Sequence, residues 1–294
     1  MTRFFRYFAG PVALAILLVA QPTAAQQEST TVETLTVVGR RQTQEEKIEA
    51  FVETTTVKSP TGQLGRWDRE ICPTTINIIP KAANMIYARI AQVATDVGLT
   101  IGPPGCKPNI FIVGTDNSKG LLENLVKVNK ELFIDDEWVI RVSRGKLQEF
   151  INSEYPVKAW FVTKRVTWEG VPYRAGSGTQ GRGRIRNTVR ADFNHVIVVL
   201  DVSRIRTVRF PALVDYVTMV SLVQINPDAK LPNVPSVLKL FEYQGQDLSQ
   251  ASGLTAWDMA LLKGLYSARR DAKRASVQRL EIEEIMKDSL AGSQ

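Results

Sequence analysis

A single histidine and two cysteines in 294 residues limit how this chain can hold a fold. Most zinc sites, haem sites, iron–sulfur clusters and thiol redox pairs need more histidine or cysteine ligands than that. Hydrophobic residues make up 44% of the sequence, which is enough for a substantial core and too much for a disordered chain. We therefore expect a globular protein that is held by its apolar core and carries neither a metal nor another cofactor.

The first 25 residues have the pattern of a signal peptide. Arg3 and Arg6 precede an apolar run of 13 residues from Phe8 to Ala20. This run is typical of a signal-peptide core and is shorter than the roughly 20 residues of a transmembrane helix. Small residues at 23–25 (Thr-Ala-Ala) predict cleavage before Gln26, and no later apolar run is long enough to span a membrane. We expect an exported protein, periplasmic or extracellular; the alternative is an uncleaved membrane anchor.

Export changes how the two cysteines are interpreted. In an oxidising compartment, Cys72 and Cys106 are expected to form a disulfide with each other. The bridge closes a loop of about 35 residues, which the chain-entropy treatment values at roughly 3–4 kcal/mol. A catalytic thiol is the competing interpretation, but neither cysteine has a histidine or a second cysteine close by in the sequence.

A polar leader is predicted after the cleavage site. Residues 26–66 are rich in threonine, glutamine and glutamate, and we assign 26–70 to a flexible leader. Within it, residues 32–41 (VETLTVVGRR) resemble the segment near the mature amino terminus of many TonB-dependent outer-membrane receptors. That resemblance implies an envelope partner that pairs with this segment by β-augmentation. The alternative is a β-prone stretch that pairs with the protein's own sheet.

The rest of the chain alternates helical and strand patterns and contains no internal repeat. Together these patterns predict a single α+β domain over 71–268, with a small mixed sheet packed by helices, and a charged helical tail over 269–294. Apolar periodicity predicts helices over 80–98, 119–133, 143–153, 211–225 and 255–290, and strands over 109–115, 157–167 and 195–202.

The glycine-rich segment contains a dinucleotide-binding pattern and a group of arginines, and each has a simpler structural explanation. Residues 176–181 (GSGTQG) match G-x-G-x-x-G, but no helix-forming run follows, so we expect a hairpin tip and not a dinucleotide site. Five arginines in and beside this segment are candidate polyanion contacts, although an edge strand kept soluble by charge explains them as well. They are Arg174, Arg182, Arg184, Arg186 and Arg190. Nucleic acid is not the expected partner of an exported chain.

The last helical segment carries a family resemblance. Residues 254–266 (LTAWDMALLKGLY) are similar to the closing helix L-[ST]-x-x-D-x-x-x-[LI]-x-x-L-Y of metzincin-type zinc peptidases and related bacterial exported families. Thr255 and Asp258 also fit a capping box, which begins a helix whatever its family. The resemblance implies a zincin-like fold over most of 75–268, with its active-site helix at 211–225.

The residues expected for zinc chemistry are absent from that helix. Zincins bind zinc through H-E-x-x-H, in which the glutamate is the general base. The three functional positions are held here by Asp215, Tyr216 and Met219, and the one histidine, His195, stands on the preceding strand. The resemblance therefore implies a degenerate frame without the metal. A helix face packed into the core is the alternative account of these three residues, and His195 is expected to be a capping or half-buried structural residue.

From the sequence we expect an exported envelope protein whose role is binding or structural, with no catalytic residue assigned. Two alternatives remain open. One is a hydrolase that uses acidic residues brought together only by the fold, and the other is a polyanion-binding module that uses the arginines of 174–190.

Overall fold

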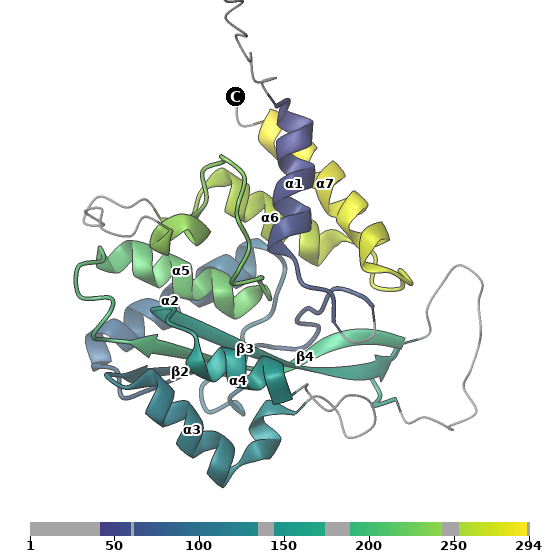
Figure 1. The fold of residues 1–294 in the computed structure, drawn as a ribbon. Helices are drawn as coiled ribbons and strands as arrows, with labels where there is room; N and C mark the ends of the chain where they lie inside the picture. Colours follow the sequence, from purple (N-terminus) through teal and green to yellow (C-terminus); the bar gives the residue numbers. More distant parts are fainter. Residues whose placement is uncertain (1–41, 60–61, 135–143, 174–188, 243–252, 293–294) are drawn as a thin grey trace, which may run out of the picture. The chain divides into compact units, whose positions relative to one another are not determined.

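The computed structural model describes residues 42–59, 62–134, 144–173, 189–242 and 253–292 of the chain (Figure 1). Short 3₁₀ turns η1 (Lys130–Phe133) and η2 (Val237–Phe241) connect some of its helices. The helices in these residues are α1 (Gln44–Thr55), α2 (Pro80–Asp96), α3 (Ser118–Val128), α4 (Arg144–Asn152), α5 (Phe210–Leu222), α6 (Ala256–Ser267) and α7 (Ala275–Ala291).

The strands form one mixed sheet with the order β1-β2-β4-β3. β1 (Pro73–Ile76), β2 (Ile110–Thr115) and β4 (Val189–Asp201) run parallel, whereas β3 (Val157–Thr167) lies antiparallel to β4 at one edge. Two parallel neighbours need a crossover connection, which α2 supplies between β1 and β2. The α+β class with a small mixed sheet is therefore confirmed.

Helices pack against both faces of the sheet (Figure 1), so the central strand β4 is apolar on both sides. Val196 and Val198 face the larger core, which α2 and α5 also line. Ile197 and Val199 face a smaller core that contains Leu122 of α3. This two-sided burial explains the unbroken apolar run that predicts a buried strand here.

The folded part begins earlier than the sequence suggests, because helix α1 lies inside the segment assigned to the leader. Thr43 and Glu46 form a capping box at its start, with backbone amide to side-chain oxygen distances of 3.0 and 3.1 Å. Ile48, Phe51 and Val52 are completely buried in the larger core. Their spacing of three and four residues is helical, although polar neighbours mask it in the composition. The boundary at residue 70 is therefore corrected to a position before α1.

The expected continuous helix over 255–290 is two helices, α6 and α7. The predicted capping box of α6 is confirmed, since the Thr255 side chain accepts from the Asp258 amide and Asp258 accepts from the Thr255 amide. Gly264 lets the two helices approach closely, because a Cβ atom there would lie 2.8 Å from a methyl carbon of Ile282. Ile282 and Met286 of α7 are fully buried, so this carboxy-terminal helix belongs to the core.

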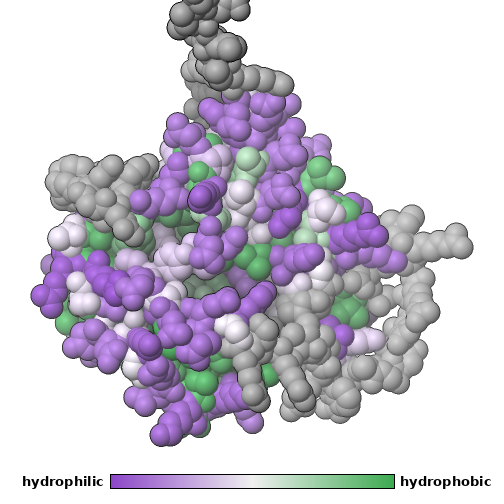
Figure 2. Space-filling view, in the orientation of Figure 1, coloured by the Kyte–Doolittle hydropathy of each residue, from purple (hydrophilic) through white to green (hydrophobic). Residues whose placement is uncertain are grey.

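Figure 2 shows hydrophilic side chains over most of the described surface on that face, with hydrophobic residues in small separate areas. The most exposed large hydrophobic residues come from different elements and include Ile79, Val128 and Leu280. Within the described ranges, no helix is both long enough and apolar enough to cross a membrane.

Candidate functional site

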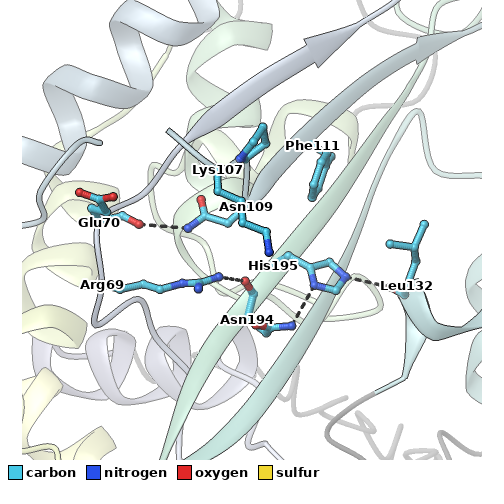
Figure 3. A pocket seen from close by; sticks show the side chains of 9 residues that line it. Arg69, Glu70, Lys107, Asn109, Phe111, Leu132, Asn194 and His195 are labelled. Carbon is cyan, nitrogen blue, oxygen red and sulfur yellow. Dashed lines mark hydrogen bonds between the residues drawn. The ribbon is translucent and has the colours of Figure 1, made fainter. Parts of the chain in front are cut away.

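A pocket of about 330 Å³ lies where β4 changes its neighbour (Figure 3). On the edge of β4 opposite β3, the segment around Asp192 pairs with Arg66, whose carbonyl accepts from the Phe193 amide at 2.9 Å. From Val196 onward β4 pairs with β2. Asn194 and His195 lie between these two stretches. We call this the His195 pocket; its lining consists of Arg69, Glu70, Lys107, Pro108, Asn109, Phe111, Leu132, Asn194 and His195.

A β-bulge shapes the floor of the pocket. The register between β3 and β4 shifts between Val162 and Thr163, which face His195 and Phe193, so Asn194 has no partner on β3. The carbonyl of Asn194 instead accepts a hydrogen bond from the Arg69 guanidinium. Bulges of this kind redirect side chains and are common beside functional sites.

His195 lies in the middle of β4, because that strand begins earlier than the sequence predicts, and both of its ring nitrogens are hydrogen-bonded. Its Nε2 donates to the carbonyl of Leu132 at 2.9 Å, and the side-chain amide of Asn194 donates to its Nδ1 at 3.3 Å. This assignment corresponds to the neutral ring with the proton on Nε2. Phe111 meets the ring edge-on with 6.2 Å between ring centroids. The ring is half-buried, as expected from the sequence.

The Cys72–Cys106 disulfide, predicted from the sequence and confirmed in the structure, fixes one wall of the pocket. The Asn109 side chain joins the same two segments: its amide oxygen accepts from the Cys72 backbone at 2.7 Å, and its amide nitrogen donates to the Glu70 carbonyl at 3.0 Å. The wall therefore consists of two chain segments linked covalently and by a buried amide.

The pocket carries an excess of positive charge. Figure 3 shows the guanidinium of Arg69 and the end of Lys107 directed toward the strand that bears Asn194 and His195, whereas the Glu70 carboxylate points away from it. In the part of the chain that the structure describes, no acid forms an ion pair with Arg69 or Lys107, and both side chains are exposed. Pro108, Phe111 and Leu132 supply an apolar side. Cationic and apolar groups thus face the same space.

A second cavity of about 210 Å³ lies at the carboxyl ends of β2 and β4, and two of its charged residues, Asp201 and Lys158, are already hydrogen-bonded within the fold. Asp201 accepts hydrogen bonds from Ser118 at 2.9 Å and from Ser203. Burial alone would raise the pKa of Asp201, but these bonds and the charge of Arg204 outweigh it and lower that pKa. The buried Lys158 donates to the carbonyl of Ile151 at 3.0 Å, and burial lowers its pKa.

Of the three α5 positions, Tyr216 and Met219 are buried, and Asp215 is partly buried and paired. Asp215 accepts hydrogen bonds from Arg89 on α2 and, at 2.9 Å, from the amide of Leu254. Tyr216 packs edge-on against Phe241, and burial raises the pKa of its hydroxyl. Met219 is completely buried. With one engaged carboxylate, one buried phenol and one core thioether, these residues do not fit a zinc site.

Metal ligands do not gather elsewhere among the described residues, which contain no cluster of three or more histidine, cysteine, aspartate or glutamate side chains. Of the five candidate arginines, only Arg190 lies in a described range. Its guanidinium bonds to Asp68, to Asp192 and to the Trp168 carbonyl. Several predicted features lie outside the described residues: the signal-peptide pattern of 1–25, residues 32–41, the motif at 176–181, and Arg174, Arg182, Arg184 and Arg186.

Comparison of the chain with protein-family models, curated proteins and solved structures found no match. The site residues are therefore argued from geometry alone. Sequence reasoning missed Arg69, Lys107 and Phe111, since their meeting depends on the change of neighbour along β4. The one available signal was that Lys107 directly follows a cysteine of the predicted disulfide.

Proposed function

We propose that this chain is an exported envelope protein with a binding role, built on a zincin-like frame that has lost the zinc ligands, and that its ligand site is the His195 pocket. Two features support export into an oxidising compartment. One is the signal-peptide pattern of residues 1–25, and the other is the Cys72–Cys106 disulfide, which is typical of oxidising compartments.

One observation carries the choice of binding over hydrolysis. Two of the three α5 side chains illustrate this, because they stabilise the fold: Asp215 links α5 to Arg89 and to the chain before α6, and Met219 fills the core. A general base has to reach a substrate proton, and a metal ligand has to reach the ion. Neither side chain is placed to do so. The His195 pocket, in contrast, offers exposed cations beside an apolar side.

The test uses the full precursor expressed in a bacterial host that exports it. We expect mature protein that begins at Gln26 by intact-mass analysis and contains an oxidised Cys72–Cys106 pair. Equilibration with zinc followed by gel filtration should leave no stoichiometric metal, and a mixed peptide library should remain uncut. Stoichiometric zinc or zinc-dependent peptide cleavage would contradict the binding role, and retention of residues 1–25 in the mature protein would contradict cleavage and export.

A further inference from the structure

We propose that the His195 pocket binds a small organic anion, a carboxylate carried on a flat apolar group. The negative group would meet Arg69 and Lys107, and the apolar group would lie against Phe111 and Leu132. This inference rests on the binding role proposed above, but it depends on neither the zincin-like frame nor export.

The two cations of the pocket have few partners of their own. Arg69 has one hydrogen bond, to the Asn194 carbonyl, so its guanidinium keeps further N–H groups that are not bonded to another described residue. Lys107 forms no hydrogen bond or ion pair with any described residue. Two acids are adjacent to Arg69 in the sequence. Asp68 is paired with Arg190 and Arg270, and Glu70 directs its carboxylate away from the pocket while its backbone carbonyl accepts from Asn109. Among the described residues, therefore, these two cations lack an anionic partner, and the ligand proposed here supplies one.

The shape and lining of the pocket favour an organic anion. A bare inorganic anion needs donors on all sides, but Pro108, Phe111 and Leu132 form an apolar side of the same pocket. A space of about 330 Å³ admits a body larger than a single carboxylate group. The ring of Phe111 is already oriented by its edge contact with His195. A flat apolar group is the ligand surface that such a wall accommodates best.

The backbone around the pocket is cross-linked. Binding costs less when the site does not have to be ordered first. The disulfide and the two bonds of the Asn109 side chain fix the wall, and the two bonds of His195 fix the floor. The groups that would contact the ligand thus stand on a preformed frame, and only the ends of Arg69 and Lys107 need to adjust.

The single histidine provides the readout. In mature protein without a histidine tag, the imidazole Cε1–H signal in the NMR spectrum belongs to His195 alone. Titration with benzoate should shift this signal and reach saturation. Benzamide, which has the same shape without the charge, should cause less than about one fifth of that shift at equal concentration. Inorganic phosphate, which has charge without an apolar group, should bind at least about fivefold more weakly than benzoate.

Two charge-removing variants and one matched control test the assignment. Lys107→Gln should weaken benzoate binding about five- to tenfold, because a charge-assisted contact is lost. Arg69→Gln should weaken it similarly, but this variant also removes the bond to the Asn194 carbonyl, so Lys107→Gln decides the matter. Lys81→Gln removes the same charge from the exposed first turn of α2 and should change the affinity less than twofold. Thermal unfolding of each variant establishes that it is folded.

Four results would overturn the inference, and three of them are comparisons. They are benzamide binding as tightly as benzoate, phosphate binding as tightly as benzoate, and Lys81→Gln weakening benzoate as much as Lys107→Gln. A His195 signal that does not move with benzoate would overturn it as well. That outcome would refute the ligand class alone, because the mature terminus, the zinc content and the peptide library test the proposed function independently.

Discussion

In helix α5, Asp215 accepts hydrogen bonds from Arg89 and from the backbone of Leu254, and Met219 is sealed in the core. In the His195 pocket, Lys107 is exposed and bonded to no other described residue. Both regions contain side chains that could contact a ligand. In α5 the fold itself already uses these side chains, whereas in the His195 pocket Lys107 has no bond to another described residue.

This difference separates residues that stabilise the fold from residues that are available to bind a ligand. Replacing a side chain with buried partners costs stability, because the partners lose their contacts or hydrogen bonds. Replacing a solvated surface cation costs almost none, so its loss shows only when a ligand is added. Substitutions in the two regions should therefore give effects of different kinds as well as of different sizes.

The largest effect is expected at the disulfide, where the pocket wall and the fold depend on the same bond. Replacing Cys72 and Cys106 together by alanine should lower the free energy of unfolding by about 4 kcal/mol in the chain-entropy treatment, since the bridge spans 34 positions. Urea unfolding at neutral pH measures this. The native protein treated with reductant should lose the same amount, whereas the double variant should not respond to reductant. Equal stability of oxidised and reduced protein would contradict the prediction.

The next effect concerns the core side of α5. Met219→Ala should lower the free energy of unfolding by about 3 kcal/mol, because the lost thioether leaves a cavity in a fully buried site. Met85→Ala on α2 is the matched control. Met85 is 41% exposed, so the same change there should cost less than about 0.5 kcal/mol. Urea unfolding measures both changes. Equal losses of unfolding free energy at the two methionines would contradict the burial of Met219 in the core.

The coupling energy of the Arg89–Asp215 pair is expected to be smaller than the two preceding effects, but specific to this pair. A double-mutant cycle of Arg89→Gln with Asp215→Asn should give a coupling energy of about 1 kcal/mol, since the pair is partly exposed. The Arg204–Glu154 pair, with side chains 42% and 80% exposed, provides a reference cycle whose coupling should be near zero. A coupling at Asp215 no larger than the reference would mean that this carboxylate is free for other roles.

The contribution of Asp201 to the free energy of unfolding is expected to depend on pH in a defined direction. Its pKa is lowered in the folded protein, so its contribution is present above the unfolded pKa of about 3.9 and is lost as the pH falls through the folded value. Asp201→Asn should therefore cost about 1 kcal/mol at pH 7. This gap between the variant and the native protein should narrow below about pH 4. Urea unfolding across pH 7 to 3 measures both values, and a gap that widens toward low pH would refute the assignment.

Local pattern predicted much of the secondary structure, because its signals lie within a few residues. The strand over 157–167 matches β3 residue for residue, and helix α2 ends within two residues of its predicted end. The capping box at Thr255 is confirmed for the same reason. Helix α1 was missed since the composition of its surroundings resembles a solvated leader, although its buried residues follow a helical spacing.

Contacts between residues far apart in the chain could not be predicted from the sequence. Arg66 illustrates this, because it donates to the carbonyls of Leu265 and Ala268, about 200 positions away, and burial lowers its pKa to about 10. The His195 pocket is of the same kind. It depends on a bulge at Asn194 and on the meeting of segments 69–70 and 107–111 across the sheet. No local pattern specifies such a meeting, apart from the disulfide that joins the two segments.

The smallest expected effect on stability is at the residue with the largest expected effect on binding. Lys107→Gln should change the free energy of unfolding by less than about 0.5 kcal/mol, because the side chain is exposed and makes no bond within the described residues. The same substitution at the buried Lys158 should cost about 2 kcal/mol, since it removes the donor to the Ile151 carbonyl. Urea unfolding of the two variants tests the comparison directly. If Lys107→Gln destabilised the protein as much as Lys158→Gln, the fold would depend on the cation of the pocket, and its availability for a ligand would be disproved.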